Sequence, residues 1–87
     1  MEVSVYDTIY KRDNGELLKF DIIVPSSFKN LAKIYEYGNN VLKEENIIAS
    51  NLISADECNF CHMDVASEKI NFDISKKGYS VFKHWGF

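Results

Sequence analysis

Cysteine, proline and long apolar runs are all scarce in this chain of 87 residues. Its two cysteines lie three residues apart, so a disulfide between them would close a very small loop and add little stability. The chain is therefore not a disulfide scaffold of the secreted kind. No apolar run approaches the roughly 20 residues of a membrane-spanning helix, and no signal peptide precedes the first strand-like residues. These absences predict a cytoplasmic protein with reduced thiols and no membrane association.

Positive charge is also in short supply. Ten Lys and Arg residues stand against 13 Asp and Glu, the formal net charge is -3, and the cations are scattered along the chain. Because nucleic-acid binding depends on several clustered cations, we expect no nucleic-acid partner. A protein partner or a second copy of the chain is compatible with the sequence, which names neither. No phosphate loop, Ser-His-Asp set or metalloprotease helix is present, so a binding or interaction module is expected rather than an enzyme.

The first two dozen residues have the pattern of a β-hairpin. A β-rich run extends from Val3 to Tyr10, and apolar residues alternate over 16–24. Between them Asn14-Gly15 suits a tight turn, because both residues tolerate positive φ. Pro25 should end the second strand, since it has no N–H to donate to the ladder.

A helix is predicted over residues 27–44 by apolar residues at helical spacing. Ser26 and Ser27 precede it as candidate N-caps. The apolar stripe expected to face the sheet contains Phe28, Leu31, Ala32, Tyr35 and Leu42, and Ile34 and Val41 widen it.

The rest of the chain predicts a second helix near 65–77, ended by Gly78 in the left-handed conformation. Short strands are expected around 51–54 and over 79–85. The element order is then ββαβαβ, which predicts one α+β domain over residues 1–87, a two-layer fold with a four-stranded mixed sheet and two helices. Since β-α-β crossovers are right-handed, we expect both helices on one face of the sheet.

One cluster, Cys58-Asn59-Phe60-Cys61-His62, gathers residue types that could do chemistry. Two thiolates on one tight turn can bind a common metal ion or form a reversible disulfide. As half of a tetrahedral zinc or iron site, the two cysteines need further ligands. The candidates to complete the site are His62, His84, Asp56 and Asp64. The predicted metal ligands are Cys58, Cys61, His62 and His84.

Three other interpretations of this cluster stay open. Cys58 and Cys61 could cycle between dithiol and disulfide, since they lie between a predicted strand and a predicted helix. The Cys-x-x-Cys-His spacing also matches covalent haem attachment, which requires export, and no export signal is present. Finally, both thiols could be small buried hydrophobes while His62 bonds a backbone carbonyl. The sequence thus predicts a binding module whose cysteine loop is structural or a small zinc site, with a thiol-disulfide redox protein as the alternative.

Asp7 and Asp21 lie among apolar residues on the two predicted hairpin strands. If they meet, repulsion between like charges would raise one pKa, as acid–base sites require. In another register, the two acids would instead face solvent, because neighbouring residues point to opposite faces of a strand. The sequence does not determine this register, and the solvent-facing arrangement is the simpler expectation.

Short segments spread over nearly the whole chain resemble a known family. In order they are Val5-Tyr6-Asp7-Thr8, Phe20-Asp21, Glu57-Cys58-Asn59-Phe60-Cys61-His62, Gly78-Tyr79 and Phe82-Lys83. Together they resemble the small bacterial family of domains of unknown function numbered twenty twenty-four, of which the Glu-Cys-x-Phe-Cys-His string is the most specific part. The resemblance implies an α+β fold of the same element order and implies no particular activity.

Overall fold

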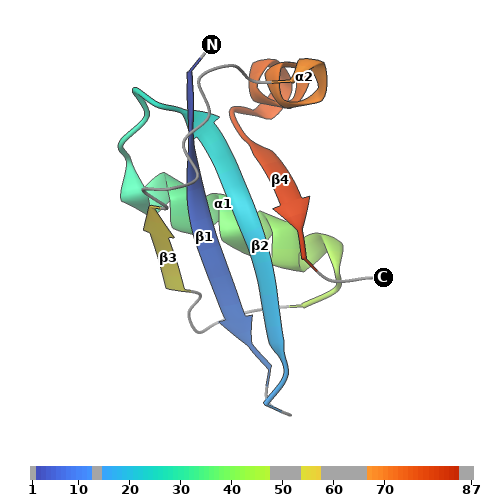
Figure 1. The fold of residues 1–87 in the computed structure, drawn as a ribbon. Helices are drawn as coiled ribbons and strands as arrows, with labels where there is room; N and C mark the ends of the chain where they lie inside the picture. Colours follow the sequence, from blue (N-terminus) through green and yellow to red (C-terminus); the bar gives the residue numbers. More distant parts are fainter. Residues whose placement is uncertain (1, 13–14, 48–53, 58–66, 85–87) are drawn as a thin grey trace.

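The structure is a computed structural model that describes residues 2–12, 15–47, 54–57 and 67–84. Within these residues the elements follow in the order β1 (Val3–Lys11), β2 (Leu17–Pro25), α1 (Leu31–Glu44), β3 (Ser54–Glu57), α2 (Glu68–Lys77) and β4 (Ser80–Lys83) (Figure 1). The α+β class and the two helices agree with the prediction. In the described part of the chain, neither helix is long and apolar enough to cross a membrane.

The β1–β2 hairpin forms the centre of the sheet, whose strand order is β3-β1-β2-β4. Its two strands pair antiparallel from Val3 opposite Pro25 to Lys11 opposite Leu17. The predicted pairing of these two segments is therefore confirmed. Gly15, in the connection between them, has a φ of 89°, a left-handed conformation that glycine adopts without steric cost.

The sheet is antiparallel between all neighbouring strands that the structure describes, and the predicted mixed sheet is wrong. β3 pairs antiparallel with β1, and β4 pairs antiparallel with β2. β3 runs parallel to β2, as expected for two strands that are connected through helix α1. However, β3 adds to the far side of β1, so these two parallel-running strands are not neighbours.

The two helices lie on opposite faces of the sheet. Ile34 of α1 packs in one core with Ile22, whereas Ile74 of α2 packs in a second core with Ile23. Since consecutive residues of a strand point to opposite faces, the two cores are separated by the sheet. The expectation of both helices on one face is wrong, because the right-handed crossover rule governs parallel strands. The strands that α2 connects, β3 and β4, run antiparallel to each other.

Helix α1 starts later than predicted and buries Ile34, Val41 and Leu42 of the predicted stripe, but not Leu31. Asn30 caps it, its side-chain oxygen accepting a hydrogen bond from the Lys33 amide at 3.2 Å. The residues that α1 buries are Ile34, Gly38, Val41 and Leu42. This is the i, i+4, i+7, i+8 stripe that a helix presents to a core. Leu31 lies in the first turn and remains 47% exposed, so its assignment to the sheet-facing side is wrong.

Helix α2 and its ends lie close to the prediction. The Ser67 hydroxyl accepts a hydrogen bond from the Ile70 amide at 3.3 Å and so caps the first turn. Gly78 ends the helix in the left-handed conformation, with a φ of 91°. β4 is shorter than the predicted strand. β3 begins at the last residue of the strand predicted over 51–54, and residues 51–53 lie outside those described.

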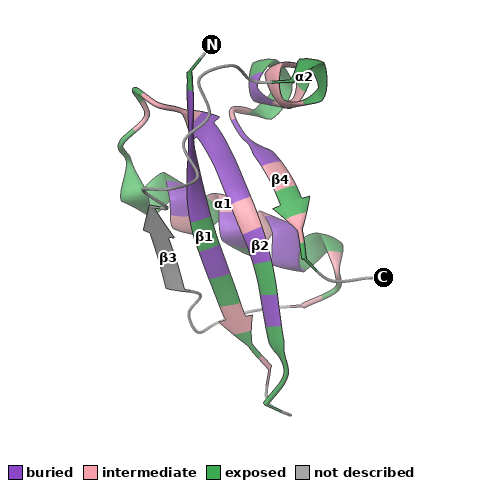
Figure 2. Ribbon diagram, viewed as in Figure 1, coloured by how far each residue is buried: buried purple, intermediate pink, exposed green. Residues whose placement is uncertain are grey.

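The fold covers one sheet face fully and the other only in part. α1 covers the main core, which contains Tyr6, Leu18, Phe20, Ile22, Val24, Ile34, Val41, Leu42 and Tyr79. On the opposite face, α2 packs only near Val5 and Ile23. Farther along β1 on that same face, Asp7, Ile9 and Lys11 are exposed (Figure 2). In the part of the chain that the structure describes, no helix covers these residues, and we call this region the open face.

Candidate functional site

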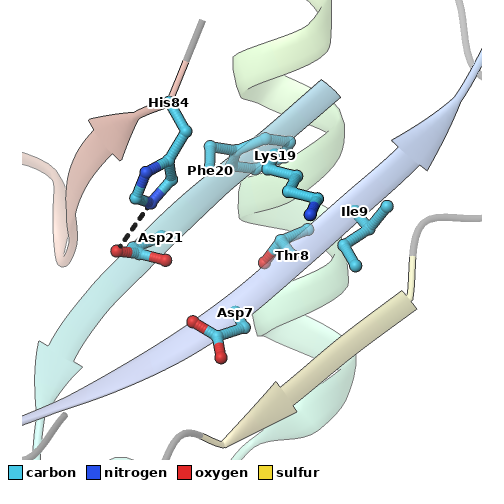
Figure 3. Close-up of a pocket in the computed structure, with 7 residues that line it drawn as sticks. All are labelled: Asp7, Thr8, Ile9, Lys19, Phe20, Asp21 and His84. Atoms are coloured by element: carbon cyan, nitrogen blue, oxygen red, sulfur yellow. Dashed lines mark hydrogen bonds and ion pairs between the residues drawn. The ribbon is translucent and has the colours of Figure 1, made fainter. Parts of the chain in front are cut away.

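A hollow of about 320 Å³ lies on the open face where β1, β2 and the end of β4 meet. The residues that line it are Asp7, Thr8, Ile9, Lys19, Phe20, Asp21 and His84 (Figure 3). Thr8 and Phe20 are buried, and their neighbours in each strand point the other way. The polar chemistry of the hollow therefore comes from two carboxyl groups, one imidazole and one ammonium group.

The two carboxyl groups face each other because the β1–β2 register places Asp7 directly opposite Asp21. Cross-strand partners have Cβ atoms about 5 Å apart, so the two carboxyl groups interact. Burial, a hydrogen bond to Asp21 and the negative charge of Asp21 raise the pKa of Asp7 above its ordinary value, and the smaller effect of His84 opposes this shift. The register thus brings together the pair whose meeting the sequence leaves open.

His84 fixes one of these carboxyl groups. It directly follows β4, and its backbone amide donates to the Lys19 carbonyl at 2.9 Å, which extends the β2–β4 ladder. Its Nε2 lies 3.0 Å from Asp21 Oδ2, and the two groups form an ion pair when the imidazole is protonated. The ring also packs edge-on against Phe82, with centroids 5.0 Å apart. Asp21 is therefore held in place by His84, and Asp7 lies beside it.

Lys19 brings a positive charge to the same hollow. It is the cross-strand partner of Ile9 and lies two residues from Asp21, hence on the same face of the sheet. Figure 3 shows its amino group beside Thr8 and Ile9, away from His84. Within the described ranges, no ion pair engages this ammonium group. The hollow thus combines a carboxylate pair with a separate cation.

A family model described as a domain of unknown function, DUF2024, matches residues 1–84. That span includes every residue that lines the hollow. The chain belongs to the DUF2024 family. No curated protein and no solved structure matches it. The chemistry of this DUF2024 chain is therefore argued from its own residues.

Of the metal ligands predicted for this DUF2024 chain, His84 is described and is bound to Asp21. Cys58, Cys61 and His62 lie outside the described residues. Among the residues that are described, no three His, Cys, Asp or Glu side chains form a group that could hold a metal ion. The metal site and its dithiol alternative therefore stay predictions from the sequence.

The ladder position of the carboxylate pair continues onto both edge strands of the DUF2024 sheet. Asp56 of β3 is the cross-strand partner of Asp7, and Phe82 of β4 is that of Asp21. Phe82 is 58% exposed and contacts the His84 ring edge-on, although it does not line the hollow itself. The roles of Lys19 and Phe82 were missed at the sequence level. The signal that could have found them is a charged or aromatic residue at the same ladder position on each strand, which is visible only once the register is known.

Proposed function

We propose that this DUF2024 domain is a binding module that holds a small ligand by a cationic group in the hollow of its open face. The observation that supports this function is the direct pairing of Asp7 with Asp21, with His84 bound to Asp21. Like charges directly opposite one another destabilise a sheet by about 0.2–1 kcal/mol. A binding site accounts for such a pair, because a bound cation would offset the repulsion. Perturbed carboxyl groups in a hollow are typical of functional sites.

A ligand ammonium group would donate hydrogen bonds to both carboxylates. In the free protein, burial and the charge of Asp21 raise the pKa of Asp7. A bound positive charge acts in the opposite direction and would lower this pKa, so binding should weaken as the pH falls and Asp7 takes up a proton. Asp21 needs little reorganisation, because His84 already holds it at 3.0 Å. Ile9 lines the hollow and is exposed, so it would contact the carbon chain of the ligand.

The proposal is tested with n-pentylamine, a simple ammonium probe, by NMR titration of the labelled protein at neutral pH. The amide signals of Asp7, Asp21 and His84 should shift, and n-pentanol, which has the same chain without the charge, should leave them in place. Asp7→Asn and Asp21→Asn should each weaken binding of the amine.

Asp73→Asn is the matched control, because it removes one carboxylate from α2, outside the hollow. Binding of n-pentylamine to this variant should equal that of the natural protein. An equal loss of n-pentylamine affinity in all three variants would show that only the net charge of the protein matters, and it would refute the proposed site.

The cysteine loop supports a second proposal, in which Cys58 and Cys61 bind zinc or, alternatively, cycle as a dithiol. Glu57, the residue before Cys58, is the cross-strand partner of Tyr6, one residue from Asp7. The motif therefore begins beside the strand that carries the carboxylate pair. Elemental analysis of protein purified under reducing conditions should find about one zinc per chain, and Cys58→Ser should abolish retention.

If the pair is a redox dithiol instead, thiol titration should reveal one fast-reacting cysteine with a pKa well below about 8.5. Absence of metal together with slow labelling of both thiols would refute both forms of this second proposal.

A further inference from the structure

The hollow contains one charged group, the Lys19 ammonium, that a bound simple cation would not contact. Lys19 lies on the same face as the carboxylate pair, and its ammonium group has no ion-pair partner within the described residues. A ligand with only a positive charge would meet Asp7 and Asp21 and would leave Lys19 unmatched. A ligand that also has a negative charge would match both.

We propose that the ligand is an α-amino acid. Its ammonium group would bind Asp7 and Asp21, its carboxylate would bind Lys19, and its side chain would lie against Ile9. This inference rests on the proposed function and adds the ligand class to it.

The spacing along the strands favours a zwitterion with its charges close together. Lys19 and Asp21 are two residues apart in β2, so their Cα atoms are about 7 Å apart. The Lys19 side chain is long and flexible, so its ammonium group can approach a small ligand bound at the carboxylate pair, with a hydrogen bond of about 2.8 Å at each end. In an α-amino acid, a single carbon joins the ammonium and carboxylate groups, which suits neighbouring side chains on one face of a strand. An ω-amino acid with a long chain would hold its charges too far apart.

The size and walls of the hollow fit the same class of ligand. Small-molecule sites have volumes of about 300–1,000 Å³, and the hollow, at about 320 Å³, is at the small end of this range. Ile9, which lines the hollow, is 36% exposed, so apolar surface is available to a ligand side chain. The structure therefore favours an amino acid with an apolar side chain of moderate length.

Three matched probes separate the contributions of the two charges. Norleucine has both charges, n-pentylamine is the same molecule without the carboxylate, and hexanoate is the same chain without the ammonium group. By calorimetric titration at neutral pH, norleucine should bind about tenfold more tightly than n-pentylamine, since one charge-assisted hydrogen bond is gained. Hexanoate should not bind, because the carboxylate pair would repel it.

Lys19→Met should remove the advantage of norleucine over n-pentylamine, whereas Lys19→Arg should retain it. The control is Lys43→Met, which removes an exposed lysine from the last turn of α1, on the other side of the sheet. It should alter neither affinity. Circular dichroism of each variant shows whether it is folded before the titration.

The outcomes distinguish this inference from the function on which it rests. If n-pentylamine binds and norleucine binds no more tightly, the amino-acid ligand is refuted and the cation site stands. The amino-acid ligand is also refuted if Lys19→Met leaves norleucine binding unchanged, or if 6-aminohexanoate binds more tightly than norleucine. If neither n-pentylamine nor norleucine binds, the proposed function and the inference both fail.

Discussion

Replacing Asp7 by Asn should stabilise the folded protein at neutral pH. Asp7 faces Asp21 across the β1–β2 ladder, and burial together with the charge of Asp21 raises its pKa. Asparagine has nearly the same shape and removes one of the two like charges. The substitution should therefore increase the free energy of unfolding, although it removes a group that we assign to ligand binding.

The size of the effect follows from the distance between the charges. At about 5 Å, the separation of cross-strand Cβ atoms, two unit charges in water repel each other by about 0.8 kcal/mol. Physiological salt reduces this by roughly half, because the Debye length is about 8 Å. Asp7 is exposed, so solvent screens the pair and the larger values of a dry interior do not apply. We expect a gain of about 0.4–0.8 kcal/mol, which raises the Tm of a domain of this size by about 2–6 °C.

The gain should depend on pH in one direction only. The pKa of Asp7 is raised in the folded state above its ordinary value of 3.8, so the folded state binds the proton more tightly than the unfolded state does. Well below 3.8 the carboxyl group is protonated in both states, and the substitution gains nothing. As the pH rises from there through the folded-state pKa, the natural protein loses stability relative to the variant. Above that pKa the full difference is present.

Urea unfolding followed by circular dichroism, at a series of pH values and at low and high salt, measures this difference. The gain should shrink in high salt, because salt screens the repulsion. Asp21→Asn is the control, since it removes the same repulsion but also the partner of His84, and should gain less. A loss of stability in Asp7→Asn, or a gain that is the same at every pH, would refute this account of the carboxylate pair.

Other variants test the rest of the fold by the same unfolding measurement. Asp73→Asn should lose about 0.5–1.5 kcal/mol at neutral pH, because hydrogen bonds from Lys69 and then Ser80 lower the Asp73 pKa. That loss should vanish as the pH falls through the lowered pKa, the opposite pH dependence to Asp7→Asn. Ile34→Ala should cost about 2–5 kcal/mol, since Ile34 is fully buried in α1. Leu31→Ala, at a site 47% exposed, should cost under about 0.5 kcal/mol, and equal losses at the two sites would contradict the observed face of α1. Gly78→Ala should cost about 1–2 kcal/mol, because alanine disfavours a φ of 91° and its Cβ would lie 3.1 Å from the Tyr37 hydroxyl oxygen. A cost near zero would show that the helix end relaxes.

The hairpin was predictable from the sequence, but the site that depends on its register was not. A two-residue Asn14-Gly15 turn would set Asp7 opposite Ile22. In the structure, the connection closes with the Arg12 amide donating to Glu16, and Asp7 meets Asp21 instead. A shift of one residue in the turn thus decides whether the two carboxyl groups are partners, because every side chain changes face with the register.

The packing of α1 and the order of the strands depend on tertiary contacts, which the spacing of apolar residues along the chain does not reveal. Leu31 and Ile34 both belong to apolar stripes, and only docking on the sheet selects the stripe that begins at Ile34. His84 was predicted to complete a metal site with the cysteine loop. The cysteine loop lies outside the described residues, and the structure places His84 against Asp21, because β4 adds beside β2. The sequence singled out His84 as a candidate ligand, but not Asp21 as the partner that the sheet gives it.

The central position of the hairpin has a consequence for how the chain folds. β1 and β2 are adjacent in sequence and in the sheet, so their contacts close only a short loop and should form early. β3 then adds to β1 and β4 adds to β2, each without needing the other. His84 arrives only with β4, at the end of the described chain. During synthesis from the N-terminus, the hairpin and the core under α1 can therefore assemble first, and the hollow is completed last.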